Sequence, residues 1–214
     1  MTPMEIERRS FEIIAEELGP LGLDPAYDLM VRRVIHTTAD FDYAKNLAWS
    51  PGAMEDLMAA LREGAAVVTD TTMALSGINK RALARCGGEA HCFIADPDVA
   101  AEAKRRGTTR SWVSMEKAAG LARPLVFAVG NAPTALFSLC RMIREGRLNP
   151  RMVIGVPVGF VNVTEAKEEL ERTAPRYIVA RGRKGGSNVA AAITNALLYT
   201  AADTLDPGRR GWQG

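Results

Sequence analysis

The segment LVFAVGNAPTAL, residues 125–136, decides the expected fold of the chain. Its first five residues are apolar without interruption, and Gly130, Asn131, Ala132 and Pro133 follow before a helical apolar pattern begins. A short apolar run bounded by Gly and Pro is typical of a strand buried on both faces. Asn131 suits the cap of the following helix, and Pro133 suits its first turn because no amide hydrogen is needed there.

The same order of strand, small-residue loop and helix returns twice. Residues 152–156 lead into a loop that begins at Pro157, and Tyr177–Ala180 leads into residues 181–187. In the second loop, glycines alternate with basic residues, and Ser187 is predicted to cap the last helix. The carboxyl ends of parallel strands meet at one edge of a sheet, which is where open α/β sheets bind ligands. Helix starts offer unpaired amides and a partial positive charge, so this edge favours an anionic ligand.

Two further strands and a series of amphipathic helices complete the pattern. The strands are expected at 65–69 and 91–95, and Asp70 after the first of them either faces the crevice or caps the next helix. We predict an α/β fold of one three-layer α/β/α domain, residues 1–205, with a mostly parallel central sheet and a flexible tail at 206–214. The main helices are expected at 3–18, 25–35, 41–47, 51–63, 97–106, 112–119, 134–144 and 187–199.

Several polar residues occupy positions where a role is expected. Ser10 interrupts the apolar stripe of the first helix, which most simply reflects a hydroxyl bonded back to a helical carbonyl. Arg33 and His36 share a helix face with Leu29. A histidine near neutral pH suits general acid chemistry, whereas a buried structural histidine or a cation at the helix end explains the position as well. Arg110 begins a helix, where a cation is mildly unfavourable unless an anion is its partner.

Composition excludes several classes of protein. With 214 residues and a formal charge of +2, the chain carries no general attraction to nucleic acid. Three cysteines without metal-ligand spacing argue for a reducing, cytoplasmic location, and no apolar run reaches the length of a membrane span. Neither a Walker A loop nor a GxGxxG motif is present. A phosphosugar or nucleotide enzyme on a doubly wound sheet stays a rival, supported only by generic glycine loops.

Seven sequence motifs, in order over nearly the whole chain, match those of a known family. They are ERRSF (7–11), RVIHTTADFDYA (33–44), TDTTMALSGINK (69–80), GTTRS (107–111), VGNAPTALF (129–137), VIGVPVGFVNVTEAK (153–167) and RGRKGGSNVAAAITNAL (181–197). Together they resemble the precorrin-8X methylmutase and cobalt-precorrin-8 methylmutase family of cobalamin biosynthesis. The motif that begins at His36, HTTADFDYA, is more similar to the cobalt-containing branch of the family than to the metal-free branch.

The resemblance implies an isomerase that moves a methyl group between adjacent ring carbons of precorrin-8X or cobalt-precorrin-8, giving hydrogenobyrinate or cobyrinate. It implies no cofactor and no protein-bound metal, a homodimer, no membrane partner and possible hand-over to neighbouring pathway enzymes. It makes His36 the acid. A non-catalytic corrinoid carrier is the alternative. The substrate-binding residues that it implies are Ser10, Arg33, Arg110, Gly130, Asn131, Ala132, Val156, Pro157, Gly185, Gly186 and Ser187.

Overall fold

A six-stranded sheet forms the centre of the computed structural model, which describes residues 1–203. The strand order is β1-β6-β5-β4-β2-β3, and all neighbours are parallel except β1, which pairs antiparallel with β6 at one edge. The predicted tail at 206–214 lies outside the described residues. The strands are β1 (Leu47–Trp49), β2 (Ala66–Thr69), β3 (Glu89–His91), β4 (Leu125–Val129), β5 (Met152–Gly155) and β6 (Tyr177–Ala180).

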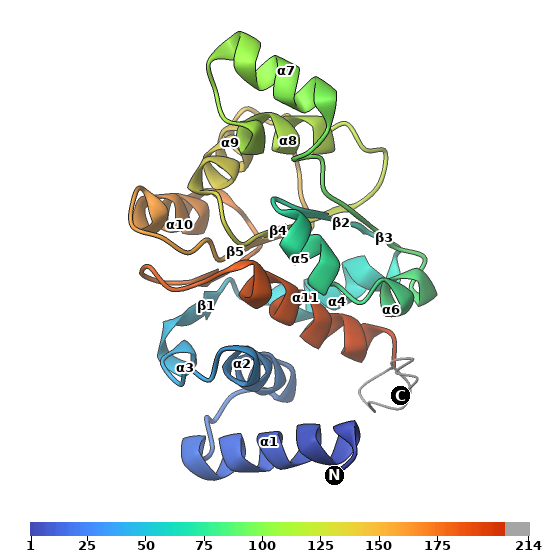
Figure 1. Ribbon diagram of the computed structural model, residues 1–214, viewed down its shortest axis with the longest axis vertical. Coiled ribbons are helices and arrows are strands. Elements are labelled where there is room, and N and C mark those ends of the chain that lie inside the picture. Colours follow the sequence, from blue (N-terminus) through green and yellow to red (C-terminus); the bar gives the residue numbers. More distant parts are fainter. Residues whose placement is uncertain (204–214) are drawn as a thin grey trace.

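Helices cover both faces of the sheet, so the predicted three-layer α/β/α architecture is confirmed (Figure 1). Successive strand residues point to opposite faces. Val126 and Ala128 of β4 therefore enter one apolar core, while Phe127 and Val129 enter the other. The first core contains residues of α2 (Pro25–Thr38), α4 (Ala53–Arg62), α6 (Lys80–Arg85) and α11 (Ser187–Ala201). The second contains residues of α8 (Arg110–Ala118), α9 (Pro133–Arg144) and α10 (Val163–Thr173).

The remaining helices lie outside these two layers. Helix α1 (Pro3–Leu18) packs on α2 at one end of the molecule, and Ile14 is its only buried residue (Figure 1). Helix α5 (Thr72–Gly77) packs on α11, α7 (Pro97–Arg106) packs on α8, and α3 (Tyr43–Asn46) is a single turn before β1. Among residues 1–203, no helix has the length and apolar character needed to cross a membrane.

Two predicted elements differ from the structure. The helix expected at 41–47 is only one turn, and the chain continues into β1, whose three residues are too few to show a periodic pattern. The strand expected at 91–95 ends at His91, because the amide of Asp96 turns back to the carbonyl of Phe93 at 3.1 Å. The apolar residues after β3 pack beside α7 instead, as Phe93 contacts the small core of Val99, Ala103 and Val113.

Two predicted helix caps are also wrong. Helix α9 begins after Ala132 rather than Asn131, and no side chain caps it. Ser187 is the first residue of α11, whose cap position is occupied by Gly186 with φ of 140°, a value that L side chains rarely adopt. By contrast, the side chain of Asp24 caps α2, accepting from the amide of Ala26 at 3.0 Å.

Candidate functional site

The loops that follow β4, β5 and β6 meet at the carboxyl edge of the sheet, as the sequence predicts. A methyl group added to Gly130 would lie only 2.6 Å from the Cα atom of Ser187. The amide of Gly186 donates to the carbonyl of Val156 at 2.9 Å. The hydroxyl groups of Thr71 and Ser187 lie 2.7 Å apart, which adds the loop after β2 to the group. We call these four loops, residues 70–71, 130–132, 156–157 and 185–187, the edge cluster.

A buried carboxylate organises the edge cluster from within. Asp70 is 1% exposed and accepts hydrogen bonds from the amides of Gly130, Asn131 and Ala132, at 2.8, 2.9 and 2.7 Å. Burial raises the pKa of Asp70, and the three amide donors act in the opposite direction. Asp70 therefore neither faces an open crevice nor caps the next helix, where Thr71 has that role.

The Asp70 contacts correct one expectation about ligand binding. The sequence predicts unpaired amides in the loop 130–132, but all three amides already have a carboxylate partner inside the protein. Gly130 and Ala132 are buried, whereas Asn131 is exposed. Val156 and Pro157 are buried as well. At this loop, a substrate carboxylate would therefore have to be bound through the Asn131 side chain.

The loop 181–186 is held by a buried lysine that sequence reasoning missed. Lys167 of α10 is 1% exposed, and its Nζ donates to the carbonyls of Gly182 and Lys184, both at 2.8 Å. Burial lowers the pKa of Lys167 to about 8. The sequence does indicate its burial, because Lys167 lies four residues after Val163 and three before Leu170, on the apolar face of the helix.

Lys167 should impose a pH dependence on stability. Its pKa is about 8 in the folded chain against 10.5 in the unfolded one, so the unfolded chain binds more protons between these values and stability rises with pH there. We expect the free energy of unfolding of the wild type, minus that of Lys167→Met, to increase across this window by on the order of 2 to 3 kcal/mol. Urea unfolding at several pH values measures the difference.

Lys184→Met is the control with the opposite sign. Hydrogen bonds from Lys184 to Asp40 and Asp42 raise the pKa of Lys184 above its ordinary value. Its contribution is therefore complete below pH 10.5 and falls above that pH. A difference for Lys167→Met that stays flat from pH 8 to 10.5 would contradict a buried, desolvated ammonium.

His36 lies in the last turn of α2, beside α1. Its ring stacks on Phe11, with centroids 5.1 Å apart and 19° between the planes. The ring is exposed on one side, but the packing of its other side against α1 lowers its pKa from 6.5, with a smaller effect from the positive charge of Arg33. Glu7 opposes this shift. In the free protein, His36 is therefore mainly a neutral imidazole at pH 7.

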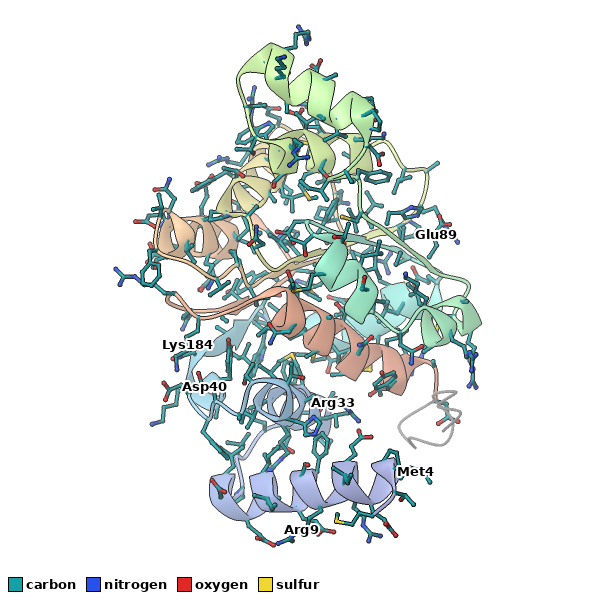
Figure 2. All side chains as sticks on the ribbon, viewed as in Figure 1. Met4, Arg9, Arg33, Asp40, Glu89 and Lys184 are labelled. Atoms are coloured by element: carbon teal, nitrogen blue, oxygen red, sulfur yellow. The ribbon has the colours of Figure 1, made fainter. Side chains whose placement is uncertain are left out.

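Ser10 and Arg33 belong to the same α1–α2 contact. The Ser10 hydroxyl donates to the carbonyl of Ile6 at 2.9 Å, which confirms the ordinary helical role expected for it. The Arg33 guanidinium pairs with Glu7 at 3.2 Å and lies 5.1 Å from the centre of the Phe11 ring and 5.3 Å from that of Tyr199. Figure 2 shows Arg33 on α2, in the layer between α1 and the rest of the chain.

One pair of acidic residues links this group to the edge cluster. Asp40 and Asp42 follow α2, and both accept from the Nζ of Lys184 at 2.6 Å. Figure 2 shows Asp40 and Lys184 beside each other. His36 precedes Asp40 by four residues, so the segment that leaves the imidazole-bearing end of α2 reaches the loop 181–186.

Arg110 borders the edge cluster on the opposite side. The Thr109 hydroxyl donates to that of Thr134 at 3.0 Å, so the start of α8 is tied to the start of α9 and to the loop 130–132. The side chain of Arg110 is exposed and forms no hydrogen bond or ion pair with any residue from 1 to 203. Its guanidinium is available to an external anion. Over the same range, no group of three or more His, Cys, Asp or Glu side chains is placed to hold a metal ion.

The family model for precorrin-8X methylmutase matches residues 5–200. The chain belongs to the precorrin-8X methylmutase family. It is 46% identical over 199 residues to the cobalt-precorrin-8 methylmutase of Priestia megaterium, covering 93% of this chain and 88% of that protein. It is 48% identical to the enzyme of that name from Salmonella typhimurium, covering 92% and 95%.

A solved methylmutase has the same fold. The crystal structure of the precorrin-8X methylmutase from Thermus thermophilus superposes with a TM-score of 0.86, at 42% identity, covering 94% of this chain and 98% of that one. The family resemblance stated from the sequence motifs is therefore confirmed, and the chain is an isomerase of cobalamin biosynthesis.

Proposed function

We propose that His36 is the acid with which this methylmutase moves a methyl group between adjacent ring carbons of precorrin-8X or cobalt-precorrin-8. The chain has two histidines. His91 lies on β3, at the edge of the sheet away from β6, and its Nε2 faces Glu89 at 3.1 Å. The observation that carries the proposal is the position of His36, whose helix end adjoins the loop 181–186 through the contacts of Lys184 with Asp40 and Asp42.

The proposed chemistry is balanced within one molecule. The carbon–carbon bond to the methyl group breaks at one ring carbon and forms at its neighbour, so substrate and product are isomers and no net oxidation occurs. His36 donates a proton to the macrocycle as electron density shifts, and takes it back when the new bond has formed. The carboxylate arms of a bound corrinoid would raise the pKa of His36 and so favour the protonated form.

The substrate carboxylates have several candidate partners. Arg110 offers a guanidinium with no internal partner among the described residues, and a guanidinium binds a carboxylate through two parallel hydrogen bonds. Arg33 would have to exchange Glu7 for a substrate carboxylate. Asn131 offers an exposed amide side chain, and Gly185, Gly186 and Ser187 form the start of α11. Val156, Pro157 and Ser10 complete the proposed binding set as neighbours of these groups.

A homodimer and a cobalt-containing substrate are further parts of the proposal. Helix α1 leaves Met4, Ile6 and Ile13 at least 40% exposed, which a second subunit would cover. Relatives at 46 and 48% identity are named for the cobalt substrate, while one named precorrin-8X methylmutase is 39% identical. The cytoplasmic location and the hand-over of product to neighbouring enzymes stay predictions.

Incubation with each substrate tests the proposed activity directly. We expect the purified chain to change the visible spectrum of cobalt-precorrin-8, because methyl migration alters the conjugated ring, and to act more slowly on metal-free precorrin-8X. Binding of both compounds without a spectral change over time would instead identify a carrier. Thermal protection by phosphate esters or nucleotides, with no response to either corrinoid, would favour the rival enzyme class.

A further inference from the structure

The backbone on both sides of Arg183 is fixed by contacts with two other elements. Lys167 donates to the carbonyls of Gly182 and Lys184, the residues immediately before and after Arg183. The carbonyl of Arg183 itself accepts from the amide of Gly159 at 3.2 Å, in the loop after β5. The position of Arg183 is therefore defined by a buried ammonium group rather than by an unsupported surface turn.

Arg183 is the basic residue of this loop without an internal carboxylate partner. Arg181 binds Glu171 through Nε and Nη2, at 3.0 and 2.8 Å, and Lys184 binds Asp40 and Asp42. The side chain of Arg183 is exposed and forms no hydrogen bond or ion pair with the residues that the structure describes. Its guanidinium lies 5.4 Å from the centre of the Phe160 ring.

The Phe160 ring belongs to an exposed apolar segment. Phe160 is 82% exposed, Val161 77% and Val158 49%, and all three belong to the loop between β5 and α10. Contiguous exposed apolar side chains are typical of interaction sites and ligand-binding grooves. An unpaired guanidinium above such a surface matches a ligand that is apolar on its face and carries carboxylates at its rim.

We propose that Arg183 and Phe160 form a subsite that binds one edge of the corrinoid ring. The guanidinium pairs with a peripheral carboxylate arm, and the phenyl ring packs against the apolar macrocycle. The subsite rests on the proposed function, because its ligand is the substrate and product of that reaction. Arg183 acts in recognition and has no part in the methyl transfer.

A comparison of two product forms tests the subsite. The probes are the corrinoid product with its free carboxylate arms and the same product with those arms converted to amides, titrated by absorbance at constant salt. Arg183→Gln is expected to weaken binding of the acid form by about 10-fold or more, since a charged hydrogen-bonded pair is lost. Its affinity for the amide form should match that of the wild type.

Arg181→Gln is the matched control. It removes the same charge at a position two residues from Arg183, and the Arg181 side chain is already paired with Glu171. It should leave both affinities within about twofold, within the range of an exposed ion pair. Phe160→Ala should weaken both forms equally, through loss of apolar contact. Equal losses for both forms in Arg183→Gln, or no loss, would overturn the carboxylate pairing. Failure of the wild type to bind either form would instead refute the proposed function.

Discussion

His36→Ala is expected to slow turnover of the corrinoid substrate by about 100-fold to 10,000-fold, the usual effect of losing a general acid. Product affinity should stay close to that of the wild type, because the substitution removes none of the proposed carboxylate partners: Arg110 and Arg183 lie on other elements, and Arg33 of α2 keeps its side chain. Single-turnover absorbance measurements give the rate of the chemical step, and a product titration gives the affinity. A carrier protein would show no such separation between rate and binding.

The pH profile sharpens this prediction. Packing against Phe11 and the charge of Arg33 lower the pKa of His36 below 6.5, so the protonated form is a minority at pH 7. If the imidazole transfers a proton, kcat/KM should rise as pH falls through the range below 6.5, and this limb should be missing in His36→Ala. His91→Ala is the matched control, and it should keep both the rate and the limb. Unchanged turnover in His36→Ala would remove the acid role.

Asp70→Ala is expected to have the largest effect on stability. It leaves the amides of Gly130, Asn131 and Ala132 without their acceptor in a buried site. Each buried donor without a partner costs roughly 1 to 3 kcal/mol, and two of the three amides belong to buried residues, so the free energy of unfolding should fall by at least about 2 kcal/mol. Urea unfolding at pH 7 measures the loss. Asp70→Asn keeps the shape and one acceptor oxygen, and it should lose less.

Substitution of an exposed aspartate is the control that separates the loss of the buried Asp70 contacts from the loss of a negative charge in general. Asp98 pairs with Lys117, and its side chain is 65% exposed, so Asp98→Ala should lower stability far less than Asp70→Ala does. Similar values for Asp70→Ala and Asp98→Ala would contradict the role of Asp70 as the internal anion of the edge cluster. The Asp70 variants should also bind product more weakly, since the same loop adjoins the start of α8.

Local patterns in the sequence predict most of the fold. Continuous apolar runs bounded by Gly and Pro give β4 and β6 with the observed bounds, and α1 and α7 also begin and end as predicted. The sequence pattern does not predict strand β1, because three residues are too few to show an alternation of apolar and polar positions. In the part of the chain that the structure describes, the strand pairs only with β6. Its antiparallel direction depends on a partner that lies more than 120 residues later in the chain.

The internal chemistry of the site was less accessible from the sequence. Asp70 binds amides of a loop sixty residues away, and such a partner cannot be inferred from the residues that flank Asp70 in the sequence. Lys167 and Arg183 likewise gain their significance from contacts between α10, the loop 181–186 and the loop after β5. The convergence of strand ends, by contrast, follows from the parallel order, and Gly130 beside Ser187 confirms it.

The structure of the chain with its corrinoid product bound tests the central claim most directly. We expect the ring to lie against the edge cluster, with an imidazole nitrogen of His36 in hydrogen-bond or van der Waals contact with the macrocycle and with carboxylate arms at Arg110 and Arg183. A product bound at the edge cluster with the His36 imidazole turned away from it, in every arrangement of subunits, would contradict the account.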